Sequence, residues 1–203
     1  MTRLRKLAWV LLVGLATALS GCGINAIPTY EEQAKAAWAQ VLNQYQRRAD
    51  LIPNLVETVK AAAAHERETL EAVVNARAKA TQMTLPADIL TNPEAMKLFE
   101  QNQAALSSAL ARLMVVVEQY PNLKANENFL TLQSQLEGTE NRIAVARRDF
   151  ITSVQQYNTE LKTIPGRWYA SWFYPEAKEM AQFVVEDRTL EVPKVDFGTT
   201  NSQ

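Results

Sequence analysis

Histidine and cysteine each occur only once in this 203-residue sequence, as His65 and Cys22. Zinc sites need several such ligands, and a two-metal site in a helical bundle needs Glu-x-x-His on two helices. His65-Glu66 begins like the metalloprotease motif H-E-x-x-H, but Thr69 occupies the second histidine position. We therefore predict no metal site and no cofactor.

Glycine is also scarce, with six residues in the chain. The sequence contains neither of the glycine-rich phosphate-binding motifs, G-x-x-x-x-G-K and G-x-G-x-x-G. No nucleophile motif lies beside His65, so a Ser-His-Asp arrangement has no support. Together these absences predict that the protein is not an enzyme.

An excess of basic charge is missing as well, because 21 basic residues face 22 acidic ones. Proteins that bind nucleic acid neutralise phosphates with clustered lysine and arginine. Nucleic acid is therefore excluded as a partner, and so is a polybasic membrane-binding surface.

The N-terminal segment has the three parts of an export signal. Three basic residues precede an apolar stretch over residues 7–19, which is shorter than a comfortable membrane span. Leu19-Ser20-Gly21-Cys22 then resembles a bacterial lipobox. We predict that residues 1–21 are a signal peptide that is removed, that Cys22 carries lipid, and that residues 22–28 form a lipidated linker. The alternatives are an uncleaved anchor helix and an exported protein with a free thiol.

Lipid on Cys22 would hold the protein on the extracytoplasmic side of a membrane. Two or three acyl chains anchor firmly, because each buried CH₂ contributes ~0.8 kcal/mol. Gly23 follows the cysteine, whereas Asp at that place commonly retains lipoproteins of Gram-negative bacteria in the inner membrane. In such a host we expect the outer membrane, with the protein facing the periplasm.

Residues 29–182 are predicted to form an all-α, antiparallel helical bundle. Apolar residues recur at helical spacing along a first helix over 29–82, with Thr29 and Glu32 as a capping box and Pro53 as a kink. A second helix is expected from Pro93, capped by Asn92, to about residue 118, and a third over 126–162. Residues 183–203 are expected to be an extended or disordered tail.

A short aromatic helix over 167–173 follows the third helix and is the most unusual local feature. It carries Trp168, Tyr169, Trp172 and Phe173. Either this helix caps the bundle, or it presents an interface to a membrane or a partner, since tryptophan and tyrosine favour such boundaries.

Five charged residues fall on or beside the apolar stripes of the long helices. Buried charges are costly unless they are paired. The group is therefore either a structural network that fixes helix register or the lining of a ligand pocket. Its members are Arg48, Glu66, Arg77, Glu140 and Arg147.

Several motifs resemble the LemA family, and together they cover nearly the whole chain after Cys22. They are Arg48-Ala49-Asp50-Leu51-Ile52-Pro53-Asn54-Leu55-Val56, His65-Glu66, Ala76-Arg77, Asn141-Arg142-Ile143-Ala144-Val145-Ala146-Arg147, Tyr157-Asn158, Ile164-Pro165 and Val192-Pro193-Lys194-Val195-Asp196-Phe197. The resemblance implies an antiparallel helical bundle with one N-terminal membrane anchor, and it implies no activity. Ile151 departs from the family, which often has Asn there.

The leading hypothesis for function is a non-enzymatic envelope protein that binds a protein partner through its bundle. A second hypothesis is a sensor that binds a small ligand near Arg48, Glu66 and Arg147. A third is a membrane-remodelling scaffold that assembles as a homo-oligomer through the long helix and the aromatic segment.

Overall fold

The structure, a computed structural model, describes residues 23–183. Within this range every regular element is a helix, which confirms the all-α prediction. The elements are α2 (Ala26–Ala62), α3 (Arg67–Gln82), the 3₁₀ turn η1 (Ile89–Thr91), α4 (Pro93–Val117), α5 (Pro121–Lys124), α6 (Glu127–Lys162) and α7 (Gly166–Phe173).

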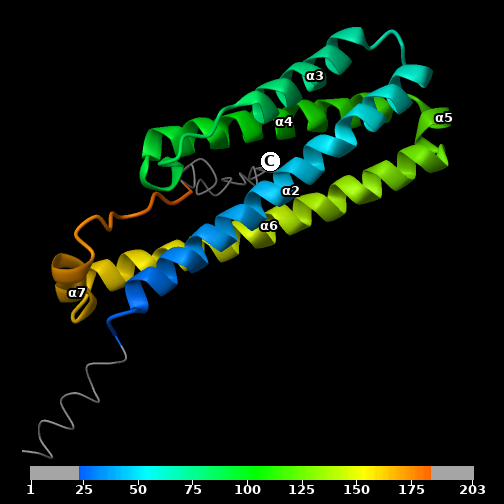
Figure 1. Cartoon of the computed structure of the whole chain (residues 1–203). Helices are drawn as coiled ribbons and strands as arrows, with labels where there is room; N and C mark the ends of the chain where they lie inside the picture. The colour runs from blue at the N-terminus through cyan, green and yellow to red at the C-terminus, as the bar shows by residue number, and fades with distance from the viewer. Residues whose placement is uncertain (1–22, 184–203) are drawn as a thin grey trace, which may run out of the picture.

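The four long helices α2, α3, α4 and α6 alternate in direction and form an antiparallel bundle (Figure 1). α2 and α6 are the longest and pack against each other along most of their length. α3 and α4 form a hairpin that covers mainly the half of this pair far from α7. We call the two ends of the bundle the α7 end and the α5 end.

The predicted single helix over residues 29–82 is wrong, because the chain turns at residues 63–66 and not at Pro53. α2 continues through Pro53, and α3 then folds back along α2. The turn lets Leu70 and Val73 of α3 join the core. An unbroken helix would leave this stripe in water, so burial of apolar surface decides where the helix ends.

The predicted capping box at Thr29 is also wrong, since α2 begins at Ala26 with Asn25 as its N-cap. Pro28 lies in the first turn, where a missing N–H costs little. The Asn92 cap predicted for α4 is confirmed, and Asn126, at the predicted start of the third helix, is the N-cap of α6. Asn92 Oδ1 accepts a hydrogen bond from the Ala95 N–H at 3.1 Å, and Asn126 Oδ1 accepts one from the Phe129 N–H at 3.2 Å.

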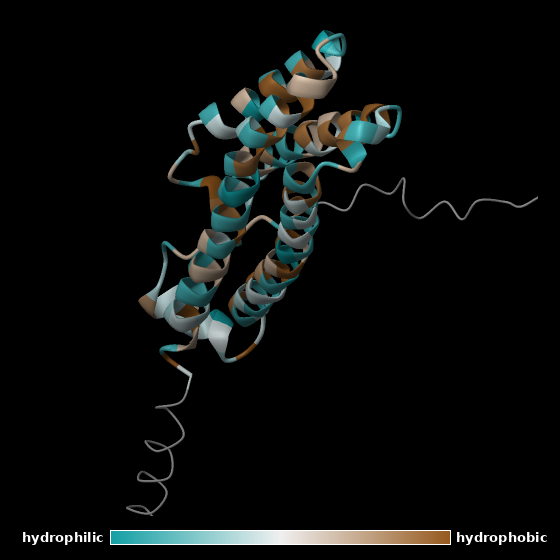
Figure 2. Ribbon diagram, turned by 90° about the vertical axis from the view of Figure 1, so that its right-hand side faces the viewer, coloured by the Kyte–Doolittle hydropathy of each residue, from teal (hydrophilic) through white to brown (hydrophobic). Residues whose placement is uncertain are grey.

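Two separate hydrophobic cores fill the bundle. Most of their residues come from the long helices, along which hydrophobic and hydrophilic residues alternate (Figure 2). The aromatic core lies toward the α7 end and includes Trp38, Tyr45, Phe99, Phe150, Tyr157 and Phe183. The aliphatic core lies toward the α5 end and includes Ile52, Leu55, Val59, Val73, Leu106, Leu113 and Leu136.

The segment after α7 returns along the aromatic core. Asn158 anchors it with two hydrogen bonds of 2.9 Å to the backbone N–H and carbonyl of Met180. Phe183, which was assigned to the tail, is instead buried beside Trp38 and Phe150. The remaining residues of the predicted tail, the predicted signal peptide and Cys22 lie outside the described residues.

Candidate functional site

A layer of polar side chains separates the two cores. On each of three helices a polar residue lies between two core residues that are seven positions apart. The three sets are Tyr45, Arg48 and Ile52 on α2; Phe99, Gln103 and Leu106 on α4; and Leu136, Glu140 and Ile143 on α6. With Ser107, the residues Arg48, Gln103 and Glu140 make up what we call the polar layer.

Arg48 is the centre of this layer and is only 1% exposed. Its Nη1 donates 2.8 Å hydrogen bonds to Glu140 Oε1 and Ser107 Oγ, and its Nη2 donates one of 2.6 Å to Gln103 Oε1. The guanidinium also lies 5.1 Å from the centre of the Tyr45 ring. One side chain therefore links α2, α4 and α6 at a fixed register.

Arg147 joins the same neighbourhood from α6. Its Nη2 donates to Glu100 Oε1 at 3.1 Å, and its Nη1 donates to the Tyr45 hydroxyl at 3.2 Å. Its guanidinium covers the Phe183 ring at 4.2 Å. Tyr45 thus contacts both arginines, so the structure brings three of the five predicted charges, Arg48, Glu140 and Arg147, into one cluster.

The cluster lines an open groove of about 720 Å³ between α4 and α6. Arg48, Arg147 and Arg148 contribute positive charge, and Glu100 and Glu140 contribute negative charge. Arg48 Nε is buried and has no hydrogen-bond partner among the described residues. The groove therefore carries mixed charge along its walls, and the unsatisfied Arg48 Nε is buried and not exposed in it.

Arg77, also predicted for the network, lies apart and acts on the backbone. Its Nε donates a 2.8 Å hydrogen bond to the carbonyl of Ala49. In an α-helix that carbonyl accepts from the residue four positions later, which here is Pro53 and has no N–H. Arg77 from α3 satisfies the acceptor that Pro53 leaves open, which explains how α2 passes through a proline.

Glu66 lies at the α5 end, away from the groove. Its Oε1 accepts a 2.9 Å hydrogen bond from the Tyr120 hydroxyl. This bond, with a smaller contribution from desolvation, raises the pKa of Tyr120. His65 is exposed in the turn between α2 and α3, so its predicted position inside a helix is wrong.

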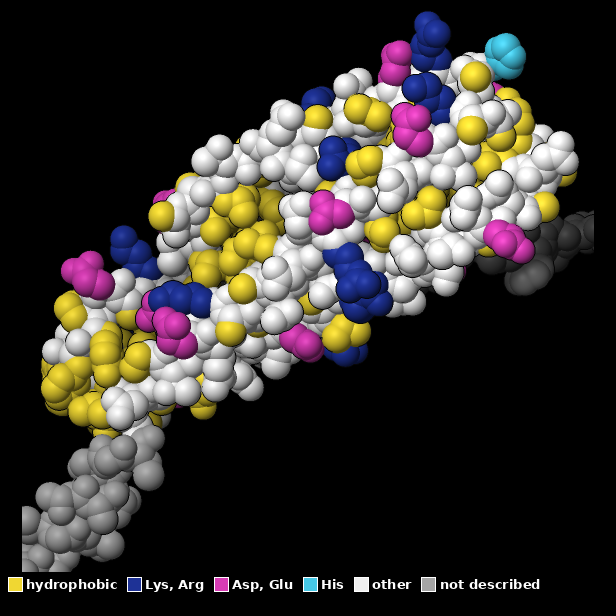
Figure 3. Space-filling model, turned by 45° about the vertical axis from the view of Figure 1, so that its right-hand side comes forward, with side chains coloured by type: hydrophobic (Ala, Val, Ile, Leu, Met, Phe, Trp, Pro, Cys, Tyr) yellow, Lys and Arg dark blue, Asp and Glu magenta, His cyan; other side chains and the backbone are white. Residues whose placement is uncertain are grey.

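The predicted aromatic helix is confirmed as α7 and closes one end of the bundle. Trp168, Trp172 and Phe173 are 51%, 72% and 56% exposed, whereas Tyr169 packs inward against the aromatic core. Gly166 permits the sharp entry into α7, because a Cβ there would lie 2.2 Å from the Glu160 carbonyl oxygen. Figure 3 shows hydrophobic side chains gathered at this end of the molecule.

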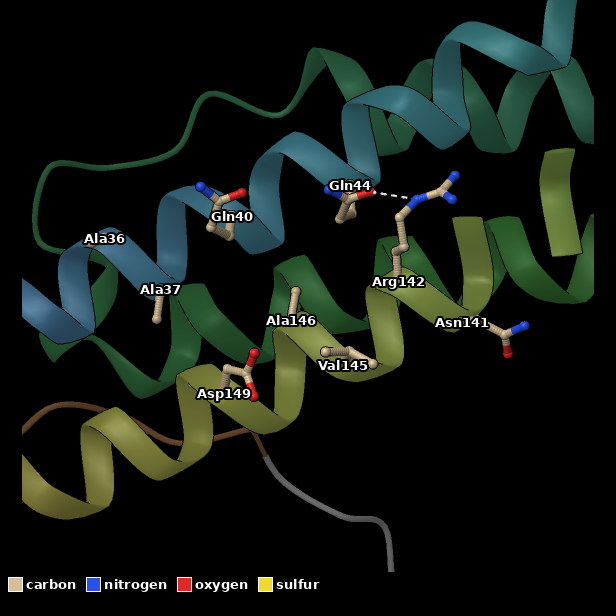
Figure 4. Close-up of a pocket in the computed structure, with 9 residues that line it drawn as sticks. All are labelled: Ala36, Ala37, Gln40, Gln44, Asn141, Arg142, Val145, Ala146 and Asp149. Carbon is tan, nitrogen blue, oxygen red and sulfur yellow. Dashed lines mark hydrogen bonds between the residues drawn. The ribbon is translucent and has the colours of Figure 1, made fainter. Parts of the chain in front are cut away.

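A second groove follows the seam between α2 and α6 (Figure 4). Ala37 on α2 and Ala146 on α6 point into the seam, and their small side chains let the two helices approach closely. Arg142 Nε donates across the seam to Gln44 Oε1 at 3.2 Å. This groove is a helix contact and holds no cluster of reactive groups among its lining residues.

Four partners in the central cluster escaped the sequence analysis: Tyr45, Glu100, Gln103 and Ser107. The signal for Gln103 was present, since it follows Phe99 by four positions and precedes Leu106 by three. A polar residue on an apolar stripe indicates burial, and this holds for Gln103 on α4 as it does for Arg48 on α2.

Over residues 23–183, no helix has the length and apolar character needed to cross a bilayer. In the same range, no three or more His, Cys, Asp or Glu side chains gather where they could hold a metal ion.

The fold and the polar layer define a class of elongated antiparallel helical bundles held in register by a buried arginine. Within this class the chain belongs to the LemA family, whose family model matches residues 37–197.

The chain is also similar to magnetosome proteins of two bacteria. It is 28% identical to magnetosome protein MamQ of Magnetospirillum gryphiswaldense over 162 residues, which cover 72% of this chain and 60% of that protein. It is 36% identical to MamQ 1 and MamQ 2 of Paramagnetospirillum magneticum over 63 residues, which cover 31% of this chain and 23% of each relative. The chain thus matches less than two thirds of the length of these relatives.

Proposed function

We propose that this protein is a lipid-anchored scaffold of the bacterial envelope, which acts by contact with a protein partner and not by catalysis. The position of Gly23 supports the proposal most directly. A Cβ on Gly23 would lie 2.9 Å from the Tyr169 ring, so residue 23 packs against α7. Lipid on the preceding residue, Cys22, would hold the bundle by its α7 end.

The bundle geometry supports a projecting role. α6 has 36 residues, which at 1.5 Å per residue corresponds to about 54 Å. The α5 end then lies farthest from the anchor, and it carries the exposed apolar side chains Val115 and Leu130. Because the polar layer fixes α2, α4 and α6 in one register, this end is presented on a rigid rod. Similarity to magnetosome proteins supports a location at a membrane.

The first experiment tests the anchor. We expect the mass spectrum of the protein isolated from membranes to show an N-terminus at Cys22 carrying acyl chains. The Cys22→Ser variant should remain unprocessed or leave the membrane fraction. A variant that is still processed and still membrane-bound would remove the lipid anchor from the proposal.

The second experiment tests the partner. A photocrosslinking residue at Val115 should capture a discrete adduct in intact cells, whereas one at Leu98, also exposed and on the same helix, should not. The Val115 adduct should disappear in the Cys22→Ser variant. A diffuse pattern of neighbours at both positions would contradict the scaffold role.

A specific observation also favours a second candidate, a sensor for a small anion in the α4–α6 groove. Arg48 Nε is an unsatisfied buried donor, and Arg147 and Arg148 line the same groove. Inorganic phosphate and small carboxylates should raise the melting temperature of the wild type but not of Arg147→Gln. A flat thermal-shift screen would remove this candidate, and sedimentation of the same samples would show whether the chain self-assembles.

A further inference from the structure

We propose that the exposed face of α7 inserts into the interface of the lipid bilayer, so that the bundle contacts the membrane through aromatic side chains as well as through its anchor. This inference rests on the proposed function, because it places the membrane at the α7 end. The patch consists of Ile164, Trp168, Trp172 and Phe173.

The two faces of α7 have different surroundings. Tyr169 and Ala170 pack against the aromatic core, whereas Trp168 and Trp172 are largely exposed. Phe173, the last residue of the helix, is also exposed, and its ring centre lies 6.4 Å from that of Tyr169. Trp168 and Trp172 are four positions apart and therefore share one face of the helix. Ile164, just before the helix, is also exposed. Large apolar side chains gathered in one exposed patch mark a contact surface.

The start of the described chain identifies the occupant of this surface. Gly23 lies against the Tyr169 ring, and consecutive Cα atoms are about 3.8 Å apart, so an anchor attached one residue earlier in the sequence would leave the bundle next to α7. Acyl chains on Cys22 would enter a bilayer directly next to the patch. A protein partner on the patch would have to fit between α7 and the membrane that holds the lipidated end of the chain. We therefore assign the bilayer, and not a protein, as the occupant of the patch.

The side chains have the chemistry of the membrane interface. Tryptophan combines a large apolar ring with one N–H donor, which favours the boundary between hydrocarbon and water. The charges near the patch in the sequence nearly cancel, because Glu176 offsets one of the two charges of Arg167 and Lys178, and Lys162 Nζ lies 2.7 Å from Glu179 Oε2. The contact should therefore depend little on lipid charge, unlike a polybasic one.

The tryptophans provide the test. If residues 1–21 are removed, three tryptophans remain, of which Trp38 is buried in the core and Trp168 and Trp172 lie in the patch. The lipidated protein is reconstituted in phosphatidylcholine vesicles with or without brominated acyl chains. We expect bromine to lower the emission by roughly half, because only the patch tryptophans reach the lipid. The Trp168→Tyr/Trp172→Tyr variant should show almost no quenching.

Two controls separate the possible failures. The Val115→Ser/Leu130→Ser variant removes exposed apolar residues at the α5 end and should be quenched like the wild type. Flotation of the same vesicles reports whether the protein is bound. Protein that floats with unquenched tryptophans overturns the α7 contact and leaves the anchor intact, whereas protein that does not float overturns both proposals. Quenching that is absent in phosphatidylcholine and appears only after an anionic lipid is added to the vesicles would also overturn an aromatic contact.

Discussion

The two halves of the bundle solve the same packing problem with different side chains. In the aromatic core the ring centre of Trp38 lies 5.2 Å from that of Phe99 and 5.3 Å from that of Phe150. The ring centres of Phe150 and Phe183 are 5.2 Å apart. The aliphatic core instead contains leucine, valine and isoleucine with Phe129 as its one ring among the described buried residues. The difference follows from what covers the α2–α6 pair in each half.

Full helices cover the aliphatic half, since α3 and α4 bring regular stripes of medium-sized side chains. The aromatic half is covered in part by the irregular segments 83–88 and 174–183 and by the short turn η1. Irregular segments offer fewer inward side chains per unit length, so larger rings must fill the space, each burying 150–250 Å² as a rule. The core covered by regular helices therefore uses medium-sized aliphatic side chains, and the core covered partly by irregular chain uses large aromatic ones.

The polar layer marks the boundary between the halves. A continuous apolar seam would let α2, α4 and α6 slide by one turn with little loss of burial. Arg48 prevents this, because any shift separates it from Gln103 and Glu140 and leaves a charge buried without partners. The layer is therefore best understood as a device for register.

The largest loss of stability is expected when a substitution to alanine creates a cavity in each of the two cores. Phe150 and Leu113 are both fully buried. Phe150→Ala should lower the free energy of unfolding by about 4 kcal/mol and Leu113→Ala by about 3 kcal/mol, as a ring leaves the larger cavity. Urea denaturation measures both values. If Phe150→Ala lowered the free energy of unfolding by less than Leu113→Ala, the irregular segments would have collapsed into the cavity. The rings of the aromatic half would then not be needed to fill its space.

The next effect tests the boundary. Arg48→Met should cost about 3 kcal/mol, near the lower end for a broken buried pair because Glu140 is half-exposed. The double variant Arg48→Met/Gln103→Leu should recover much of this loss, because it joins the two cores into one apolar seam. Its NMR amide signals should be broadened, because α2, α4 and α6 can then pack in more than one register. Arg112→Met, at an exposed arginine on α4, is the control and should stay within about 0.5 kcal/mol of the wild type. Sharp spectra in the double variant would refute the register role.

The sequence predicts the elements whose ends are decided locally. α4 and α6 begin where Asn92 and Asn126 supply side-chain caps, and those signals need no tertiary information. The end of α2 could not be predicted in this way, because Ala61 to Ala64 favour helix and only the packing of α3 breaks it. Pro53 predicts a kink within the helix, but α2 continues through it, because Arg77 donates to the Ala49 carbonyl that the proline leaves without a donor.

The candidate site was predicted in part for a similar reason. A charge on an apolar stripe indicates burial, which identified Arg48, Glu140 and Arg147. The stripe gives the face of a helix but not which partner lies opposite, so Glu66 and Arg77 were grouped with residues from which the structure separates them. Antiparallel pairing of helices, which the sequence leaves open, decides these distances.

A smaller effect tests the passage of α2 through Pro53. Arg77→Met should cost about 2 kcal/mol, because the buried Ala49 carbonyl loses its donor. In the background of Pro53→Ala, the helix regains an N–H for that carbonyl, and the same change should cost about 1 kcal/mol less. The four unfolding free energies form a double-mutant cycle. Equal losses in both backgrounds would show that Arg77 acts by packing alone.

The smallest effect is expected at high pH and separates the two ends of the bundle. Burial, with a lesser contribution from Glu31, raises the pKa of Tyr157 in the aromatic core. Above about pH 10, where an unfolded tyrosine loses its proton, the folded chain keeps its own, so the free energy of unfolding falls as pH rises. Tyr157→Phe should flatten this decline in denaturation series at increasing pH. Tyr120→Phe should flatten it less, because Tyr120 owes its raised pKa chiefly to the Glu66 hydrogen bond near the surface. An equal flattening by both substitutions would show that burial in the aromatic core is not what sets the alkaline limit.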